Sequence, residues 1–107
     1  MKRILFLCSR NKLRSPTAEE IFAGRPGIEV DSAGLSADAE VVLSEEQVEW
    51  ADLILVMERI HRARLNKRFG HLLADKRVAV LGIPDRYEFM EEALIEKLKV
   101  SCKNYLN

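Results

Sequence analysis

Short apolar segments recur along the chain, separated by longer amphipathic or polar ones. Segments 3–7, 52–57 and 77–81 are apolar almost throughout, which is typical of strands buried on both faces of a sheet. Segment 28–32 alternates weakly between apolar and polar residues and predicts a further strand. The segments between and after these strands predict helices at 16–24, 44–51, 58–69 and 91–105.

Local signals mark the ends of these helices. Ser15 is a suitable N-cap and Pro16 suits the first helical turn that follows it. Ser44 and Gln47 have the spacing of a capping box at the start of the second helix. In the last helix, Leu98 and Cys102 recur at helical spacing, so we expect Cys102 in the core.

Strands therefore alternate with helices along the whole chain. This order predicts an α/β fold, a three-layer sandwich in which helices cover both faces of a parallel sheet. The length of 107 residues fits one domain, and no repeat or linker divides residues 1–107.

Composition narrows the function without identifying it. Basic and acidic residues balance at 17 each, which gives no support for a nucleic-acid binder or a membrane-surface protein. No apolar run approaches the length of a membrane span, and the start of the chain does not resemble a signal peptide. Two cysteines in a chain of this size do not require a disulfide. We expect a monomer in the reducing cytoplasm.

The most informative segment runs from Cys8 to Ser15, between the first strand and the first helix. Backbone N–H groups and the helix dipole favour an anion at such a place, and they favour the thiolate form of a cysteine there. Cys8 would attack phosphorus and form a cysteinyl-phosphate. Arg14 would hold two phosphate oxygens with its planar fork and stabilise the transition state.

The other residues of this segment support the same interpretation. The Ser15 hydroxyl would donate to the Cys8 sulfur, and Asn11 tolerates the positive φ that a tight loop requires. Backbone N–H groups along the loop would bind the remaining phosphate oxygens. The expected substrate-binding residues of the loop are Ser9, Arg10, Asn11, Lys12, Leu13 and Ser15.

Hydrolysis also needs a general acid that protonates the leaving oxygen. Asp85 follows the last apolar strand, and the carboxyl ends of parallel strands meet at one edge of a sheet. Asp85 is therefore the expected acid, although an aspartate after Pro84 is also a common turn residue. Tyr87 would form an aromatic wall against an aryl phosphate.

These segments resemble the low-molecular-weight protein tyrosine phosphatase family. Segment 8–19 reads Cys-Ser-Arg-Asn-Lys-Leu-Arg-Ser-Pro-Thr-Ala-Glu and is similar to the family's signature. Further similar segments follow in the same order at 31–34, 51–58 and 84–87. The resemblance implies a four-stranded parallel sheet, hydrolysis of phosphomonoesters without a metal or other cofactor, and Asp85 as the acid. It also implies that Ser32 forms a hydrogen bond with Asn11.

The chain departs from the family in several ways. It is shorter than most members, so loops around the site must be trimmed. Arg10 stands where the family usually has glycine, and it adds charge at the mouth of the site. Leu13 replaces a frequent second cysteine that could protect Cys8 by a reversible disulfide. Arg86 replaces the proline that usually follows the acid.

The favoured function is a protein tyrosine phosphatase acting on a phosphorylated protein or a small aryl phosphate. A thiol-based arsenate reductase is an alternative, but it needs further cysteines and only Cys102 remains. A phosphocarrier, in which a loop cysteine accepts a phosphoryl group and passes it to a sugar, is another alternative. It needs neither an arginine clamp nor an acid, and the presence of both candidates here favours hydrolysis. A catalytically weak module that binds phospho-ligands is the last alternative. The basic helix 58–69 is expected to present a solvated face, with partner binding as the alternative. His61 is expected at the surface, although it follows a central strand and could approach the cleft.

Overall fold

The computed structural model describes residues 1–106 and contains the predicted alternation of strands and helices. Its sheet is entirely parallel and four-stranded, with the strand order β2-β1-β3-β4. In chain order the elements are β1 (Lys2–Cys8), α1 (Arg14–Phe22), β2 (Ile28–Gly34), α2 (Glu45–Trp50), β3 (Leu53–Val56), α3 (Arg59–Phe69), the 3-10 turn η1 (Gly70–Leu72), β4 (Arg77–Val80) and α4 (Glu92–Cys102).

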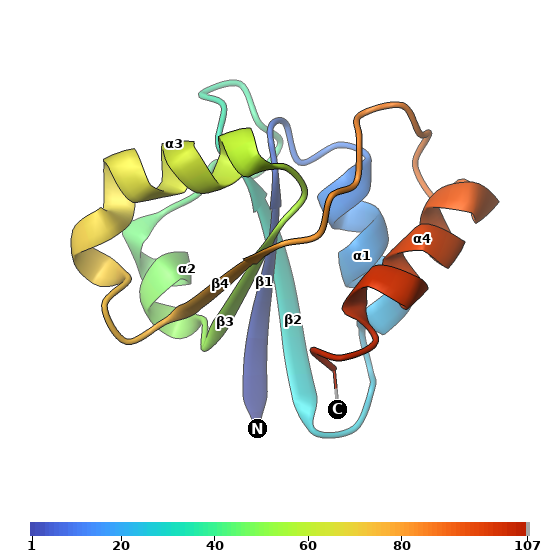
Figure 1. The fold of residues 1–107 in the computed structure, drawn as a ribbon, viewed down its shortest axis with the longest axis horizontal. Helices are drawn as coiled ribbons and strands as arrows, with labels where there is room; N and C mark the ends of the chain where they lie inside the picture. Colours follow the sequence, from blue (N-terminus) through green and yellow to red (C-terminus); the bar gives the residue numbers. More distant parts are fainter. Residues whose placement is uncertain (107) are drawn as a thin grey trace.

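Helices cover both faces of the sheet, as predicted (Figure 1). Successive residues of β1 point to opposite faces: Ile4 and Phe6 pack with the cluster under α1 and α4, and Leu5 and Leu7 with the cluster under α2 and α3. All four side chains are fully buried. The strand is therefore apolar throughout because it lies at the centre of a three-layer sandwich.

Some helix and strand boundaries in the structure differ from the predicted ones. The first helix begins at Arg14 with Leu13 as its N-cap residue, so the prediction of Ser15 as the cap is wrong. The Ser15 hydroxyl contacts the Cys8 sulfur and the Asn11 amide instead of a free backbone N–H. The capping box of Ser44 and Gln47 at the start of α2 is confirmed.

The topology places the loop after β1 at the centre of one sheet edge. β1 lies between β2 and β3. The connection that leaves β1 runs to β2 on one side, and the connection that leaves β2 crosses to β3 on the other side. The crevice at such a switch point, beside the carboxyl ends of the strands, is where open α/β sheets bind ligands. Cys8, at the end of β1, pairs with Gly34 at the end of β2 and lies at this edge.

Candidate active site

The loop that follows Cys8 turns its carbonyl groups outward. The carbonyl oxygens of Cys8, Ser9 and Arg10 accept hydrogen bonds from backbone N–H groups of the segment 35–40 that follows β2, at 2.8–3.0 Å. Among the described residues, no acceptor takes the backbone N–H groups from Ser9 to Leu13. The loop is therefore fixed from outside by its carbonyls, and its amides stay free for an anion.

Gly34 allows this close approach of the two segments. A Cβ atom at Gly34 would lie 2.6 Å from the Ser9 carbonyl oxygen and 2.6 Å from the Ala39 Cβ, closer than real Cβ contacts. Any larger residue would push segment 35–40 away from the loop. The glycine at the end of β2 thus positions the loop after β1.

A directed chain of hydrogen bonds leads to the Cys8 sulfur. The Asn11 side-chain amide donates to the Ser15 and Ser32 hydroxyl oxygens, both at 2.9 Å, and Ser32 donates to the Glu19 carboxylate. Asn11 has a φ of 56°, the left-handed conformation expected for it. Because Ser15 accepts from Asn11, its own proton is available for the Cys8 sulfur 3.0 Å away. The structure thus contains the predicted contacts of Ser15 and Ser32.

Arg14 is 3% exposed and is held from one side. Its Nη1 atom donates to the Glu58 carboxylate at 2.5 Å and to the Ile83 carbonyl oxygen at 2.8 Å. Both hydrogens of Nη1 are therefore used, and the Nε and Nη2 hydrogens remain for a ligand. The Asp85 carboxylate lies 3.8 Å from Nε.

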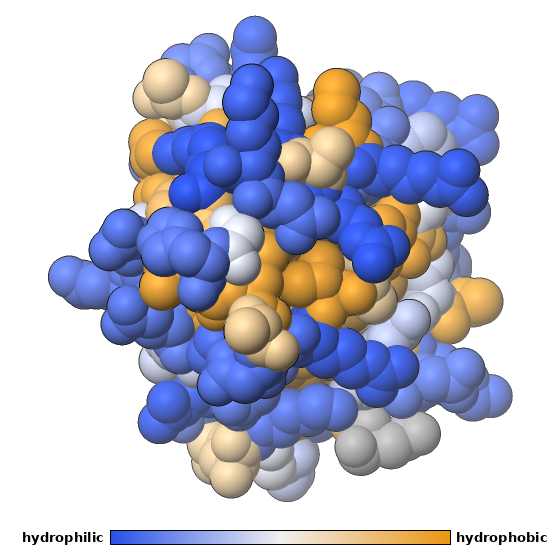
Figure 2. Space-filling view, turned by 60° about the vertical axis from the view of Figure 1, so that its left-hand side comes forward, coloured by the Kyte–Doolittle hydropathy of each residue, from blue (hydrophilic) through white to orange (hydrophobic). Residues whose placement is uncertain are grey.

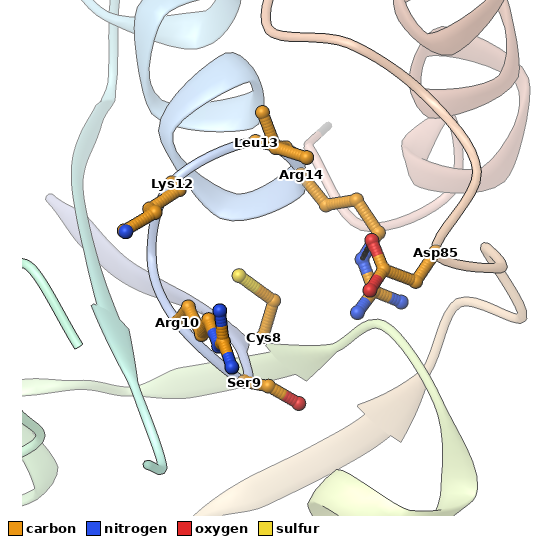
Figure 3. Close-up of a pocket in the computed structure, with 7 residues that line it drawn as sticks. All are labelled: Cys8, Ser9, Arg10, Lys12, Leu13, Arg14 and Asp85. Atoms are coloured by element: carbon orange, nitrogen blue, oxygen red, sulfur yellow. Dashed lines mark ion pairs between the residues drawn. The ribbon is translucent and has the colours of Figure 1, made fainter. Parts of the chain in front are cut away.

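These groups line one cavity of about 420 Å³ (Figure 3). In Figure 3, the loop curves around the Cys8 sulfur, and Asp85 lies beside the Arg14 guanidinium at the same opening. The cavity is lined by Cys8, Ser9, Arg10, Lys12, Leu13, Arg14 and Asp85. The structure therefore brings together the expected nucleophile, clamp and acid.

Arg10 and Lys12 lie at the rim of this cavity. Arg10 forms an ion pair with Asp38 at 3.8 Å, and Lys12 forms one with Glu40 at 3.9 Å. All four side chains are at least half exposed, so each pair contributes less than about 1 kcal/mol. The charge of Arg10 thus lies at the mouth, as expected, but an acidic neighbour balances it.

Three of the expected substrate-binding residues do not line the cavity: Asn11, Ser15 and Tyr87. Asn11 and Ser15 are buried and form hydrogen bonds that hold the loop. Tyr87 is the aromatic residue among the three. Its ring packs against the core cluster under α1 and α4, and the Arg86 guanidinium lies 5.8 Å from its centroid. The loop that carries Asp85 and Tyr87 is tied to α1, because the Met90 backbone N–H donates to the Thr17 hydroxyl at 2.9 Å. An aromatic substrate wall at Tyr87 stays a prediction that this geometry does not favour.

His61 lies inside the protein, so the prediction of a surface histidine is wrong. Its side chain is fully buried, because it lies one turn from Leu65 and two turns from Phe69 on the inner face of α3. Desolvation by burial and the nearby Arg14 charge lower the pKa of His61 from 6.5 to about 4. His61 is therefore neutral at pH 7.

The hydrogen bonds of His61 fix its tautomer. The Glu58 backbone N–H donates to Nδ1 at 3.0 Å, so the ring proton is on Nε2. Nε2 then donates to the Ser9 hydroxyl oxygen 2.9 Å away. Ser9 lines the cavity, and its own hydroxyl proton stays available for a ligand.

Sequence reasoning missed the residues that hold the site from a distance. Glu58 orients Arg14 across 44 positions, and Glu19 ends the chain of hydrogen bonds from Cys8. No local pattern indicates these pairings. For His61 a signal existed, because its spacing of four from Leu65 and eight from Phe69 predicts the buried face of a helix.

Cys102 lies in the core cluster under α1 and α4 and does not line the cavity. Cys102 is fully buried, as expected, and desolvation raises the pKa of its thiol to about 12. Within residues 1–106, no group of three or more histidine, cysteine, aspartate and glutamate side chains is arranged to hold a metal ion. The same part of the chain contains no helix long and apolar enough to cross a membrane.

Sequence comparison gives a relative of known activity. No protein-family model matches the chain. A protein-arginine-phosphatase from Geobacillus stearothermophilus is 33% identical in an alignment 91 residues long, with a coverage of 63% of this chain and 62% of that protein. The chain thus matches less than two thirds of the length of this relative.

Solved structures with the same fold cover nearly the whole chain. SP-PTP, a low-molecular-weight protein tyrosine phosphatase from Streptococcus pyogenes, superposes with a TM-score of 0.79 at 17% identity, covering 99% of this chain and 91% of that one. A YwlE mutant from Bacillus subtilis gives a TM-score of 0.71 at 23% identity, covering 100% of both chains. At these identities the comparison shows the fold, and it confirms the predicted architecture.

Proposed function

We propose that this chain, a short and divergent relative of the low-molecular-weight protein tyrosine phosphatases in sequence and fold, hydrolyses phosphorylated protein side chains through a cysteinyl-phosphate. One observation carries the proposal: Cys8, the loop with its unpaired amides, Arg14 with its free edge, and Asp85 line the same cavity. A tetrahedral dianion fits the N–H donors of the loop and of Arg14, and Asp85 in its protonated form is placed to supply a proton.

In the first step the Cys8 thiolate attacks phosphorus while the bond to the leaving group breaks. Asp85, in its protonated form, gives its proton to the leaving atom. Arg14 and the loop amides stabilise the charge on the three equatorial oxygens. The products are cysteinyl-phosphate, the dephosphorylated side chain and the Asp85 carboxylate.

In the second step water attacks the same phosphorus from the position that the leaving group occupied. The Asp85 carboxylate takes a proton from the water, and the Cys8 sulfur departs with the electrons of the bond to phosphorus. The Ser15 hydroxyl donates to the departing sulfur and stabilises its charge. Inorganic phosphate leaves and the starting protonation state is restored.

Phosphotyrosine and phosphoarginine are the two substrates to compare. The sequence predicts phosphotyrosine, whereas the Geobacillus relative is a protein-arginine-phosphatase. No aromatic side chain is among the residues that line the cavity, so the described site gives an aryl group no stacking partner. The chemistry at phosphorus is the same for both, with Asp85 protonating an oxygen in one and a nitrogen in the other.

The alternative of an arsenate reductase loses support from the structure. Such an enzyme passes a disulfide between thiols, and a thiolate is the attacking species. Cys102 is fully buried, and its raised pKa keeps it protonated at neutral pH. A resolving role for Cys102 would therefore require α4 to open.

The test is turnover of p-nitrophenyl phosphate in the presence of EDTA by the wild type and by Cys8→Ser. We expect the wild type to turn over and the variant to lose turnover while it still binds inorganic phosphate in calorimetry. Full activity of Cys8→Ser would contradict the mechanism. A panel of phosphotyrosine and phosphoarginine peptides then identifies the preferred bond.

Asp85 is tested through its leaving-group dependence. Asp85→Asn should slow the release of poor leaving groups much more than that of p-nitrophenol, because only poor ones need protonation. Asp85→Glu serves as the matched control that keeps a carboxyl group. An equal loss for good and poor leaving groups in Asp85→Asn would exclude this role.

A further inference from the structure

The outer edge of β4 is open. Backbone N–H groups of Arg77, Leu81 and Ile83 donate to carbonyl oxygens of β3 and the residues that flank it, so the odd-numbered residues of this strand face β3. The N–H and C=O groups of Val78 and Val80 therefore point away from β3. Within residues 1–106, no other strand pairs with this edge. It is a template for an added strand.

A shallow groove, here called the α3–β4 groove, runs along this edge. It consists of two adjoining hollows that share Arg59 and Val80. Ala63 and Asn66 lie in one hollow, and Gly82 and Pro84 lie in the other. Figure 2, which brings the side of α2 and α3 forward, shows an apolar strip in the middle of this face with hydrophilic side chains around it. The surface has the apolar floor and polar rim of a peptide site.

The charged side chains that α3 contributes to this rim are basic. Arg59 and Arg62 line the groove and are exposed, whereas Arg64, Lys67 and Arg68 line a separate hollow beside segment 35–37. Glu58 is the one acidic residue that lines the groove, and it is paired with Arg14. An occupant that carries acidic side chains toward α3 would neutralise charge that no acidic residue of this helix balances.

The groove ends beside the catalytic cavity. Pro84 lines the groove and its neighbour Asp85 lines the cavity. Glu58 links the two from the other side, because it lines the groove and binds the Arg14 guanidinium. A chain that lies along β4 and continues past Pro84 would reach the opening above Cys8.

We propose that the α3–β4 groove binds an acidic, extended segment of the protein substrate, which adds as a strand beside β4 and places the phosphorylated side chain in the cavity. This proposal rests on the proposed function and names its substrate class. The added strand would pair with Val78 and Val80 through its backbone. Acidic side chains on one face of the strand would contact Arg59 and Arg62, which gives preference for acidic sequences.

The binding test separates the groove from catalysis. Unphosphorylated, fluorescently labelled peptides in which valine alternates with glutamate are titrated into Cys8→Ser protein and followed by anisotropy. We expect binding that weakens at least about tenfold when lysine replaces glutamate. Methylation of the backbone nitrogens at alternate positions, in the register that faces β4, should abolish binding, while methylation in the other register should not. Equal affinity of all four peptides would overturn the proposal.

Variants of α3 locate the site. Arg62→Glu should weaken binding of the glutamate peptide at least about tenfold, whereas Lys67→Glu, an equal charge change on the side of α3 that faces segment 35–37, should have little effect. An equal loss in both variants would show general charge attraction and overturn the proposal. The proposal would also be overturned if the groove bound a single-stranded oligonucleotide and did not bind the glutamate peptide.

Activity assays distinguish a failure of the groove proposal from a failure of the proposed function. Arg62→Glu should leave turnover of p-nitrophenyl phosphate unchanged and lower kcat/KM at least about tenfold for phosphorylated peptides with glutamate flanks. If the wild type hydrolyses p-nitrophenyl phosphate but shows no preference for acidic flanks, the groove proposal fails and the proposed function stands. If the wild type does not hydrolyse p-nitrophenyl phosphate, the proposed function fails, and the binding test still decides whether the groove takes an acidic strand.

Discussion

Asn11 offers the sharpest test of how the loop is held, because its backbone and side chain contribute separately. The residue is 5% exposed and has a φ of 56°. Its amide donates to Ser15 and Ser32, each at 2.9 Å. Asn11→Ala removes both hydrogen bonds and places a Cβ-bearing residue without a polar side chain in the left-handed region. Asn11→Gly removes the same two bonds but relieves the backbone strain.

The magnitudes follow from these contacts. Each buried hydrogen bond between neutral groups contributes about 1 kcal/mol to the free energy of unfolding. The left-handed conformation costs alanine about 1 kcal/mol more than glycine. We therefore expect the free energy of unfolding to fall by about 3 kcal/mol in Asn11→Ala and by about 2 kcal/mol in Asn11→Gly.

The assay is equilibrium unfolding in urea, with the slope of each transition checked for a common value. The expected order of stability is wild type, then Asn11→Gly, then Asn11→Ala. Asn11→Ala with wild-type stability would show that the two hydrogen bonds contribute nothing. Equal stability of the two variants would refute the argument from backbone conformation.

Three further predictions concern the supports of the loop and of Arg14. Gly34→Ala should lower the free energy of unfolding by about 2 kcal/mol in urea, because its Cβ meets the Ser9 carbonyl at 2.6 Å; unchanged stability would contradict the close approach. The pKa of His61 is about 4 in the folded protein and 6.5 as a free side chain, so the unfolded state binds more protons between these values. The contribution of neutral His61 to the free energy of unfolding is complete above pH 6.5 and is lost as the pH falls toward 4, at up to about 1.4 kcal/mol per pH unit. His61→Gln should therefore lose less stability than the wild type over this pH range. An unchanged pH dependence in the variant would refute the assignment. Glu58→Gln should lower kcat about tenfold to a hundredfold by loosening Arg14, with Glu58→Asp retaining more activity; equal kcat in both variants would count against the ion pair.

The sequence indicated the parts of this fold that depend on local patterns. Apolar runs predicted β1, β3 and β4, and the segment from Cys8 to Ser15 predicted a loop between a strand and a helix. Asn11 could be predicted at a positive φ because asparagine tolerates that conformation better than other residues with a Cβ. In each case the interactions that determine the local structure involve residues close together in the sequence.

Contacts between distant segments could not be predicted in the same way. The partner of Arg14 is Glu58, on another strand's loop, and nothing near Arg14 selects it. The Ser15 hydroxyl satisfies every local rule for an N-cap, but the sulfur of Cys8 and the amide of Asn11 take it. The spacing of His61 from Leu65 and Phe69 indicates the inner face of α3, but its hydrogen bond with Ser9, 52 positions away, has no local signal.

The central claim is that Cys8 carries the phosphoryl group during turnover. Wild-type protein is mixed rapidly with p-nitrophenyl phosphate, quenched in acid within the first turnover and analysed by intact mass spectrometry and peptide mapping. The account predicts one phosphoryl group per chain, bound to the Cys8 sulfur, together with a burst of p-nitrophenol of the same amount. Turnover with no phosphoryl group on Cys8 at any time point, or with the group on another residue, would contradict it.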